Sequence, residues 1–317
     1  MKSRLEQAYR EAECIWIDRA SRIVCMSDCH RGVGNRGDNF LPNRNIFLAA
    51  LQYYYDCGFS YMELGDGDEL WENKGLSRIV DYHSDIFLLL ARFHHVGRFQ
   101  MLYGNHDCRK KNGKFLQSHC RECYCEGLGQ RPGRDGDWAC DCSERGVCEE
   151  GCRRDLFGEI QAKESILLKD RSTGHEILLL HGHQGDLMND FLWPLTAFLV
   201  RYVWRPLELF GVYDPTSAAR NYKKRKKTEM RLGRFAEKKQ ILVIAGHTHR
   251  SVLPQPGESF YLNDGSCVHP SGITAMELEN GRLTLVKWSV TVKHSRNLSV
   301  EREVLAGPVA WEDYWKS

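Results

Sequence analysis

The 317-residue chain lacks a long apolar segment, since no run of about 18 uncharged apolar residues occurs in it. Its most apolar stretch, 191–210, is interrupted by two prolines and three charged residues, so we expect no transmembrane helix. The first ten residues are mostly polar and charged, which is unlike a secretory signal and favours a cytoplasmic protein. Peripheral contact with a membrane surface stays open.

The chain also has little net charge, because 44 Lys and Arg residues face 42 Asp and Glu residues. A balance of +2 creates no overall field for nucleic acid, so a nucleic-acid partner is not expected despite one basic run at 223–227. Internal repeats and low-complexity tails are absent too. The remaining composition, with 27% charged and 42% hydrophobic residues, is that of a soluble globular protein. Nothing in it indicates the oligomeric state.

Strand and helix patterns alternate along the chain. A helix at 43–57 precedes a strand at 59–64, and a helix at 76–95 precedes a strand at 98–103. Such alternation predicts an α/β fold with largely parallel strands and a site at their carboxyl ends. The other expected elements are a helix at 2–13, a hairpin or first strand at 15–17 and 21–26, strands at 159–168 and 176–180, an interrupted helical stretch at 190–211, a basic helix at 216–239, and strands at 241–245, 260–262, 272–278 and 283–290, with turns at Asp264-Gly265 and Asn280-Gly281.

Polar clusters follow five of the expected strands. Four acids crowd the exit of the strand at 59–64, and such like charges repel one another unless a cation neutralises them. These acids are Asp66, Asp68, Glu69 and Glu72. The other clusters are Asp28-x-His30, Gly104-Asn105-His106-Asp107, His181-Gly182-His183 and Gly246-His247-x-His249. One histidine near a strand end is usually structural, but five clusters of carboxylate, amide and imidazole predict a site for a divalent metal such as Zn, Mn or Fe.

These five motifs, in this order, resemble those of the calcineurin-like metallophosphoesterases from Asp28 to His249. The resemblance implies a four-layer α/β/β/α metallophosphoesterase sandwich, formed by residues 1–317 as a single domain, with two divalent ions of Mn, Fe or Zn. Carried over by position, one ion would be held by Asp28, His30, Asp66 and His249. The other would be held by Asp66, Asn105, His181 and His247, so that Asp66 bridges the pair.

The implied chemistry is hydrolysis of a phosphate ester, diester or pyrophosphate. Two metals about 3.5–4 Å apart lower the pKa of a bridging water, and the resulting hydroxide attacks phosphorus. His106 would protonate the leaving oxygen, and Glu69, or alternatively Asp68, would orient His106. The alternatives are a phosphomonoesterase acting on proteins or small molecules, a catalytically silent binding scaffold of the same fold, and, from the basic run, a nucleic-acid phosphodiesterase.

One branch of this superfamily shares further features with the chain. The spacing Gly65-Asp66-x-x-Glu69-x-Trp71 resembles the UDP-2,3-diacylglucosamine hydrolases, and so does a helical insertion between the fourth and fifth motifs, here 187–240. In that branch the insertion caps the site and holds acyl chains, which implies a lipid- or nucleotide-linked substrate. The implied lid residues are Trp193, Tyr202, Trp204, Arg205, Lys223 and Arg225. A helix packed on the body with a solvated charge run is the alternative.

The chain also departs from that branch. The branch has arginine at the position of His106, has no counterpart of His183, and lacks a cysteine-rich insertion, so the substrate stays open.

The chain has 13 cysteines, and an odd number without an export signal indicates a reducing compartment. Eight of them lie in 108–152, a segment that interrupts the strand and helix alternation and is expected to be an insertion at the rim of the site. They are Cys108, Cys120, Cys123, Cys125, Cys140, Cys142, Cys148 and Cys152. Their close spacing predicts structural zinc, while disulfides, free thiols or a cluster stay open. Cys29, between two expected ligands, is expected to point away from the metals.

Overall fold

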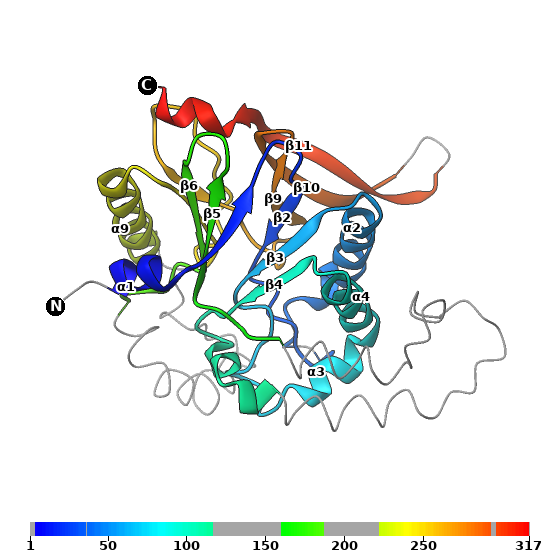
Figure 1. Ribbon diagram of the computed structural model, residues 1–317. Helices are drawn as coiled ribbons and strands as arrows, with labels where there is room; N and C mark the ends of the chain where they lie inside the picture. Colours follow the sequence, from blue (N-terminus) through cyan, green and yellow to red (C-terminus); the bar gives the residue numbers. More distant parts are fainter. Residues whose placement is uncertain (1–3, 36, 117–159, 187–221, 293–295, 317) are drawn as a thin grey trace.

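The fold was analysed in a computed structural model that describes residues 4–35, 37–116, 160–186, 222–292 and 296–316. Two β-sheets stack face to face, and helices cover both outer faces (Figure 1). The six-stranded sheet contains, in spatial order, β11 (Leu298–Ala310), β10 (Arg282–Val292), β9 (Ile273–Glu279), β2 (Ile23–Met26), β3 (Ser60–Leu64) and β4 (Phe99–Leu102). β2, β3 and β4 are mutually parallel and almost wholly buried, as expected for parallel strands covered on both faces.

The second sheet has five strands. In spatial order these are β1 (Glu13–Ile17), β5 (Ser165–Asp170), β6 (Glu176–Leu180), β7 (Leu242–Ala245) and β8 (Tyr261–Asn263). Only β5 and β6 pair antiparallel, so β6, β7 and β8 end at the same edge. Their carboxyl ends bring the fourth and fifth motifs to one side of the sandwich.

Helices form the outer layers. α2 (Arg44–Asp56), α3 (Ser77–Tyr82) and α4 (Ser84–His95) pack their apolar faces on the six-stranded sheet. On the other side, α1 (Arg4–Glu11) and α9 (Tyr222–Lys239) cover the five-stranded sheet. Between the sheets lies a third set of apolar side chains, including Met62, Leu179 and Ile244. The predicted four-layer α/β/β/α sandwich is therefore confirmed.

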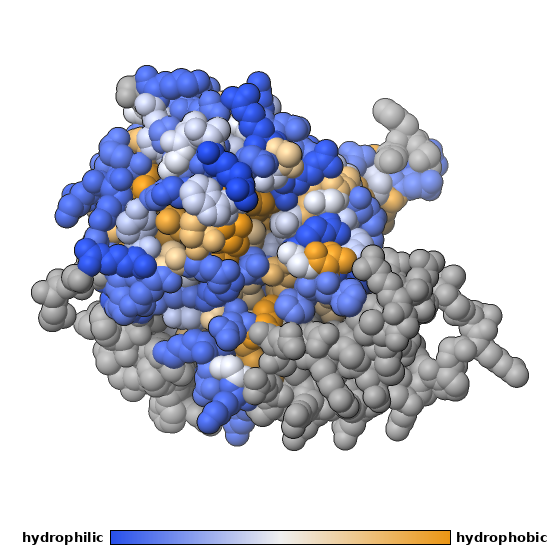
Figure 2. All heavy atoms as spheres, viewed as in Figure 1, coloured by the Kyte–Doolittle hydropathy of each residue, from blue (hydrophilic) through white to orange (hydrophobic). Residues whose placement is uncertain are grey.

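Short 3₁₀ helices complete the described chain. They are η1 (Leu41–Asn43), η2 (Cys108–Lys111) and η6 (Trp311–Trp315). Among the described residues visible in Figure 2 most are hydrophilic, and apolar ones are visible mainly in the middle of this face. Within the part of the chain that the structure describes, every helix is too short or too polar to cross a bilayer.

Several sequence expectations are corrected. Of the two alternatives for 15–17 and 21–26, a hairpin or a first strand, the hairpin is wrong, because β1 pairs with β5 in one sheet and β2 pairs with β3 and β9 in the other. The expected helix at 76–95 is two helices that meet at His83, whose ring is buried against Phe40. Of the expected strand at 159–168, the described part becomes regular only at Ser165.

The carboxyl-terminal strands differ as well. Asp264-Gly265 is not a hairpin turn, because β8 and β9 belong to different sheets and this loop crosses between them. Asn280-Gly281 does join β9 to β10, and both residues have the positive φ that a two-residue hairpin turn needs. The long strand β11 was not expected from the sequence, where Gly307-Pro308 interrupts its pattern.

Candidate metal centre

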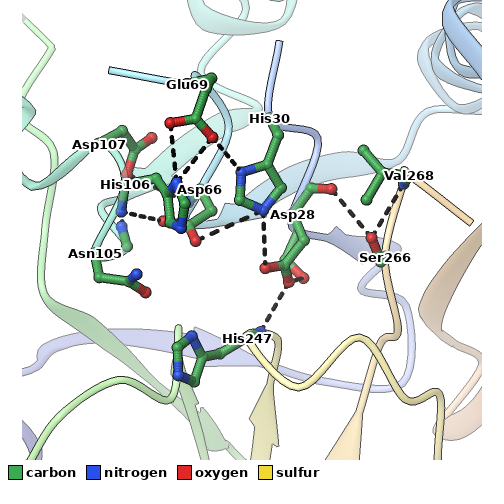
Figure 3. A network of polar contacts seen from close by, with 12 residues as sticks. Asp28, His30, Asp66, Glu69, Asn105, His106, Asp107, His247, Ser266 and Val268 are labelled. Atoms are coloured by element: carbon green, nitrogen blue, oxygen red, sulfur yellow. Dashed lines mark hydrogen bonds and ion pairs between the residues drawn. The ribbon is translucent and has the colours of Figure 1, made fainter. Parts of the chain in front are cut away.

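The polar clusters meet where the strands of both sheets end. Asp28 and His30 follow β2, Asp66 follows β3, and Asn105 follows β4 (Figure 3). His181 follows β6 at once, and the fifth motif, with His247 and His249, follows β7. The structure thus brings together all seven side chains expected to bind metal, and their burial ranges from complete to partial.

The backbone at these positions is unusual. Five of the seven residues have φ between 49° and 67°, in the left-handed region that residues other than glycine rarely adopt. They are Asp28, His30, Asp66, His247 and His249. Loop-to-loop hydrogen bonds hold this conformation, for example from the His30 amide to the Asp66 carbonyl at 2.9 Å. Strained conformations of this kind persist where the surrounding structure over-determines them, and they cluster at functional sites.

One donor set consists of Asp28, His30 and His249, whose nearest ligand atoms all lie within 4.8 Å of one another. Asp28 Oδ1 lies 3.0 Å from His249 Nε2 and 3.7 Å from His30 Nε2. The other oxygen of Asp28, Oδ2, accepts the His247 backbone amide at 2.8 Å. Asp28 is therefore held so that Oδ1 faces the two imidazoles.

A second donor set consists of Asp66, His181 and His247. His181 Nδ1 donates to the Leu64 carbonyl at 2.9 Å, so Nε2 is the nitrogen left for a ligand bond. That Nε2 lies 3.2 Å from Asp66 Oδ2 and 3.2 Å from Asn105 Oδ1. His247 Nε2 is buried and has no hydrogen-bond partner among the described residues.

Asp66 lies between the two donor sets. Its Oδ2 is 3.2 Å from His181 Nε2 in one set and 3.8 Å from His30 Nε2 in the other. Its Oδ1 accepts the backbone amide of His106 at 2.8 Å. One carboxylate therefore faces imidazoles of both donor sets.

The electrostatics of the centre favour positive charge. Burial opposes ionisation of the buried imidazoles, but Asp66 and Asp28 outweigh it and raise the pKa of His181 to about 9. The same carboxylates, with Glu69, raise the pKa of His30 well above its usual value. Burial and the nearby His181 instead lower the pKa of His247 to about 3, so this imidazole is neutral. Buried carboxylates that attract protons onto neighbouring imidazoles form a donor set that fits divalent cations, which bind after those protons leave.

Glu69 connects His106 to the centre. Its two oxygens lie 2.8 and 3.0 Å from His106 Nδ1, and Oε2 also lies 3.0 Å from His30 Nδ1 (Figure 3). Both imidazoles can therefore donate to one carboxylate. Although Glu69, His30 and His106 lie close enough to hold a metal, these hydrogen bonds explain their proximity.

Two cations of the protein were missed by the sequence reasoning. Arg31 and Lys110 are fully buried, and both pair with Asp68, at 2.8 and 2.7 Å. Arg31 also pairs with Glu63 at 2.8 Å. Burial opposes ionisation of Asp68, but these two cations hold its pKa well below the usual value. Asp68 is thus part of a buried ion network, and among the described residues His106 is hydrogen-bonded to Glu69 instead.

Asp107 fixes the turn that carries Asn105 and His106. Its carboxylate accepts the backbone amides of Gly104 at 2.7 Å and Gly67 at 3.1 Å, and it pairs with Lys110 at 2.7 Å. Asp107 therefore holds the loop through its backbone amides, as aspartate often does in turns. A signal for Lys110 was present in the sequence, since it lies three residues after Asp107.

Asp264 and Ser27 were also missed. Ser27 Oγ lies within hydrogen-bond distance of both the Asp28 and the Asp264 carboxylates, yet a hydroxyl has only one proton to donate. Burial and the charge of Asp28 raise the pKa of Asp264 well above its usual value. A protonated Asp264 can then donate to Ser27, which donates to Asp28. The crossing loop after β8 therefore supports the candidate ligand Asp28 through Asp264 and Ser27.

The remaining sequence candidates are only partly described. His183 is buried with its ring centroid 5.5 Å from that of His181. Cys29 is buried in the core under the helices, away from the ligand atoms, as expected. Lys223 and Arg225 lie on the amino-terminal half of α9. Of the eight cysteines of the insertion only Cys108 lies among the described residues, and it is a free, buried thiol. The lid candidates Trp193, Tyr202, Trp204 and Arg205 lie outside the described residues, as do Cys120, Cys123, Cys125, Cys140, Cys142, Cys148 and Cys152.

No family model matches the chain, and no curated protein matches it. Among solved structures, Vacuolar Protein Sorting 29 from Cryptosporidium parvum is similar at a TM-score of 0.37 and 11% identity, over 92% of this chain and 100% of that one. Vps29 from Chaetomium thermophilum is similar at a TM-score of 0.36 and 12% identity, over 91% of this chain and 100% of that one. Neither likeness is close enough to bear on the activity of this chain.

Proposed function

We propose that this protein is a metal-dependent phosphoesterase that hydrolyses a phosphate ester, diester or pyrophosphate. The observation that carries the proposal is the pair of donor sets that face one carboxylate, Asp66. A single structural histidine needs no such arrangement, whereas two cations that share a ligand do.

The donor set fits two divalent ions. Asp28, His30, Asp66 and His249 would hold one of them, and Asp66, Asn105, His181 and His247 the other. Imidazole with carboxylate and amide oxygen suits Mn, Fe or Zn. When bound, such a pair supplies an acidified water and neutralises charge on the phosphate oxygens.

His106 is the proposed general acid. Glu69 holds Nδ1, and the side chain keeps 23% of its surface exposed, so a substrate can reach the imidazole. Burial lowers the pKa of His106, but the charges of Glu69 and Asp66 outweigh it and raise the pKa above its usual value. The imidazolium can then donate the Nε2 proton to the leaving oxygen.

The substrate is proposed to carry a lipid or nucleotide part beside its phosphate. Support comes from α9, whose middle contacts the loops of the centre and whose amino-terminal half carries a run of basic residues. Arg231 Nη2 donates to the Gly182 carbonyl at 3.1 Å, directly after His181, and Glu229 pairs with Arg250 at 3.2 Å, directly after His249. The helix is thereby attached to two loops that carry candidate ligands, and its cations suit an anionic substrate.

The test is hydrolysis of bis-p-nitrophenyl phosphate and of p-nitrophenyl phosphate by chelated protein to which Mn has been returned. Cleavage of the diester alone supports the lipid or nucleotide branch, and cleavage of the monoester favours the phosphomonoesterase alternative. Asp66→Asn should abolish either activity, whereas Asp56→Asn on the outer helix α2 should not. No turnover of either ester by the wild type would contradict the proposal and favour a binding scaffold.

A further inference from the structure

The indole of Trp71 lies flat on the imidazole of His106. The ring centroids are 3.9 Å apart and the planes differ by 20°. Trp71 is 4% exposed, so this contact is buried and its geometry is set by the surrounding chain. The sequence spacing alone placed Trp71 near the site without showing what it touches.

One short segment, 66–71, holds His106 in three ways. Asp66 accepts the backbone amide, Glu69 accepts from Nδ1, and Trp71 covers one face of the ring. The Trp71 amide also donates to Glu69 Oε1 at 3.2 Å, so the same residue helps to place the carboxylate. The ring of His30 stands edge-on to His106 at 4.6 Å, which limits movement in another direction.

A hydrogen bond at Nδ1 alone leaves the imidazole free to tilt about that contact. Such a tilt would swing Nε2, which lies across the ring, away from a fixed position. A flat aromatic neighbour removes this freedom, because tilting the imidazole would separate the stacked faces. We infer that Trp71 is a positioning residue that fixes the ring plane of His106, so that Nε2 is directed at the leaving oxygen of the substrate. The inference rests on the proposed phosphoesterase function.

Protonation matters most when the leaving group is poor. Trp71→Leu should therefore lower kcat for diphenyl phosphate, which expels phenolate, by about 10- to 100-fold, since positioned acids contribute about 10²–10⁴-fold. For bis-p-nitrophenyl phosphate, whose leaving group needs little protonation, kcat should fall by less than about 3-fold. KM should change little for both esters. Trp71→Phe keeps an aromatic face and should restore most of the diphenyl phosphate rate.

Two comparisons separate positioning from damage to the fold. Trp288 is a buried indole of the outer core, so Trp288→Leu should destabilise the protein without changing the ratio of the two rates. In a His106→Gln background, Trp71→Leu should no longer lower that ratio, because its partner is gone. An equal loss on both esters in Trp71→Leu, or a selective loss that persists without His106, would overturn the inference.

A second readout needs no turnover. An indole stacked on an imidazole shields the ring C–H protons, so the His106 signals, assigned with His106→Gln, should lie upfield in metal-free wild type. They should move downfield in Trp71→Leu and much less in Trp71→Phe. Unshifted His106 signals in the wild type would overturn the stacking itself. If the wild type cleaves neither ester while these signals behave as expected, the proposed function fails and the placement of the ring stands.

Discussion

Replacing Glu69 by glutamine removes one negative charge that two imidazoles share. Glu69 lies 2.8 Å from His106 Nδ1 and 3.0 Å from His30 Nδ1, and its own pKa is lowered to about 2 because the charges and hydrogen bonds of these imidazoles outweigh the effect of burial. A hydrogen bond to a charged group contributes about 1.5–3 kcal/mol. Loss of this interaction with the His106 imidazolium should therefore lower kcat about 10- to 100-fold.

The pH dependence of kcat tests the same interaction, because the charge of Glu69 fixes the direction in which the profile should shift. In the wild type, burial lowers the pKa of His106, but Glu69 and Asp66 raise it above its usual value. A general acid must be protonated, so activity is lost as the pH rises through the pKa of His106. Without the charge of Glu69 that pKa falls, and the alkaline limb of the kcat profile should move to lower pH.

The assay must separate this effect from metal loss. Because Glu69 also orients His30, metal affinity should drop about 10- to 100-fold, and kcat is therefore measured at saturating Mn. Glu312→Gln, which removes a carboxylate paired with the exposed Arg19, is the matched control and should change neither kcat nor the limb. A Glu69→Gln variant with wild-type kcat and an unmoved alkaline limb would refute the assignment of Glu69 and His106.

Three further outcomes follow from the structure. Arg31→Met should lower the free energy of unfolding in urea by about 3–5 kcal/mol, because it leaves Glu63 and Asp68 buried without their main partner. Arg19→Met, which removes an exposed ion pair, should lower it by about 0–1 kcal/mol, and similar losses in the two variants would contradict the buried network. Burial opposes ionisation of Asp170, but hydrogen bonds from Ser172 and Thr173 outweigh it and lower the pKa to about 2. The free energy of unfolding of the wild type should therefore fall as the pH drops from about 4 towards 2. The Asp170→Asn variant should lose less of its free energy of unfolding over that range. An equal loss in both proteins would speak against those hydrogen bonds. If the cysteine-rich insertion at 108–152 binds structural zinc, some zinc should remain after Asp66 and His249 are both replaced, and its complete loss would reject that idea.

The sequence was sufficient to place the candidate ligands, because each motif directly follows a strand and parallel strands end at one edge. Asp28, Asp66 and His181 illustrate this: they are 38 or more residues apart in sequence, yet Asp66 Oδ2 lies 3.2 Å from His181 Nε2. The four-layer sandwich, in contrast, was expected only from the resemblance carried by those motifs.

The sequence pattern could not predict which strands pair with each other when they are far apart in the chain. The alternation of residues within β1 and β2 fits either a hairpin or two separate strands, and the structure is needed to show that they belong to different sheets. The same limit applies to Asp264-Gly265, whose turn residues fit a hairpin but serve a crossing loop.

The acid cluster after β3 shows where local reasoning failed. Crowded acids indicate a cation, but they do not say whether it is a metal or a side chain. Asp66 faces the candidate metal centre, whereas Asp68, two residues later, faces Arg31 and Lys110 on the other side of the turn. An extended segment would place residues 66 and 68 on the same face, but Asp66 has a φ of 50°, so the chain turns there and the two carboxylates separate.

The most direct test of the account is to count bound metal and measure turnover in the same samples of wild type and Asp66→Asn. Chelated wild type should be inactive, and on return of Mn it should regain hydrolysis of bis-p-nitrophenyl phosphate as about two ions bind per chain. Asp66→Asn should bind fewer ions and stay inactive. Hydrolysis by chelated wild type, full hydrolysis by Asp66→Asn, or a wild type that binds two ions and cleaves no phosphate ester would contradict the account.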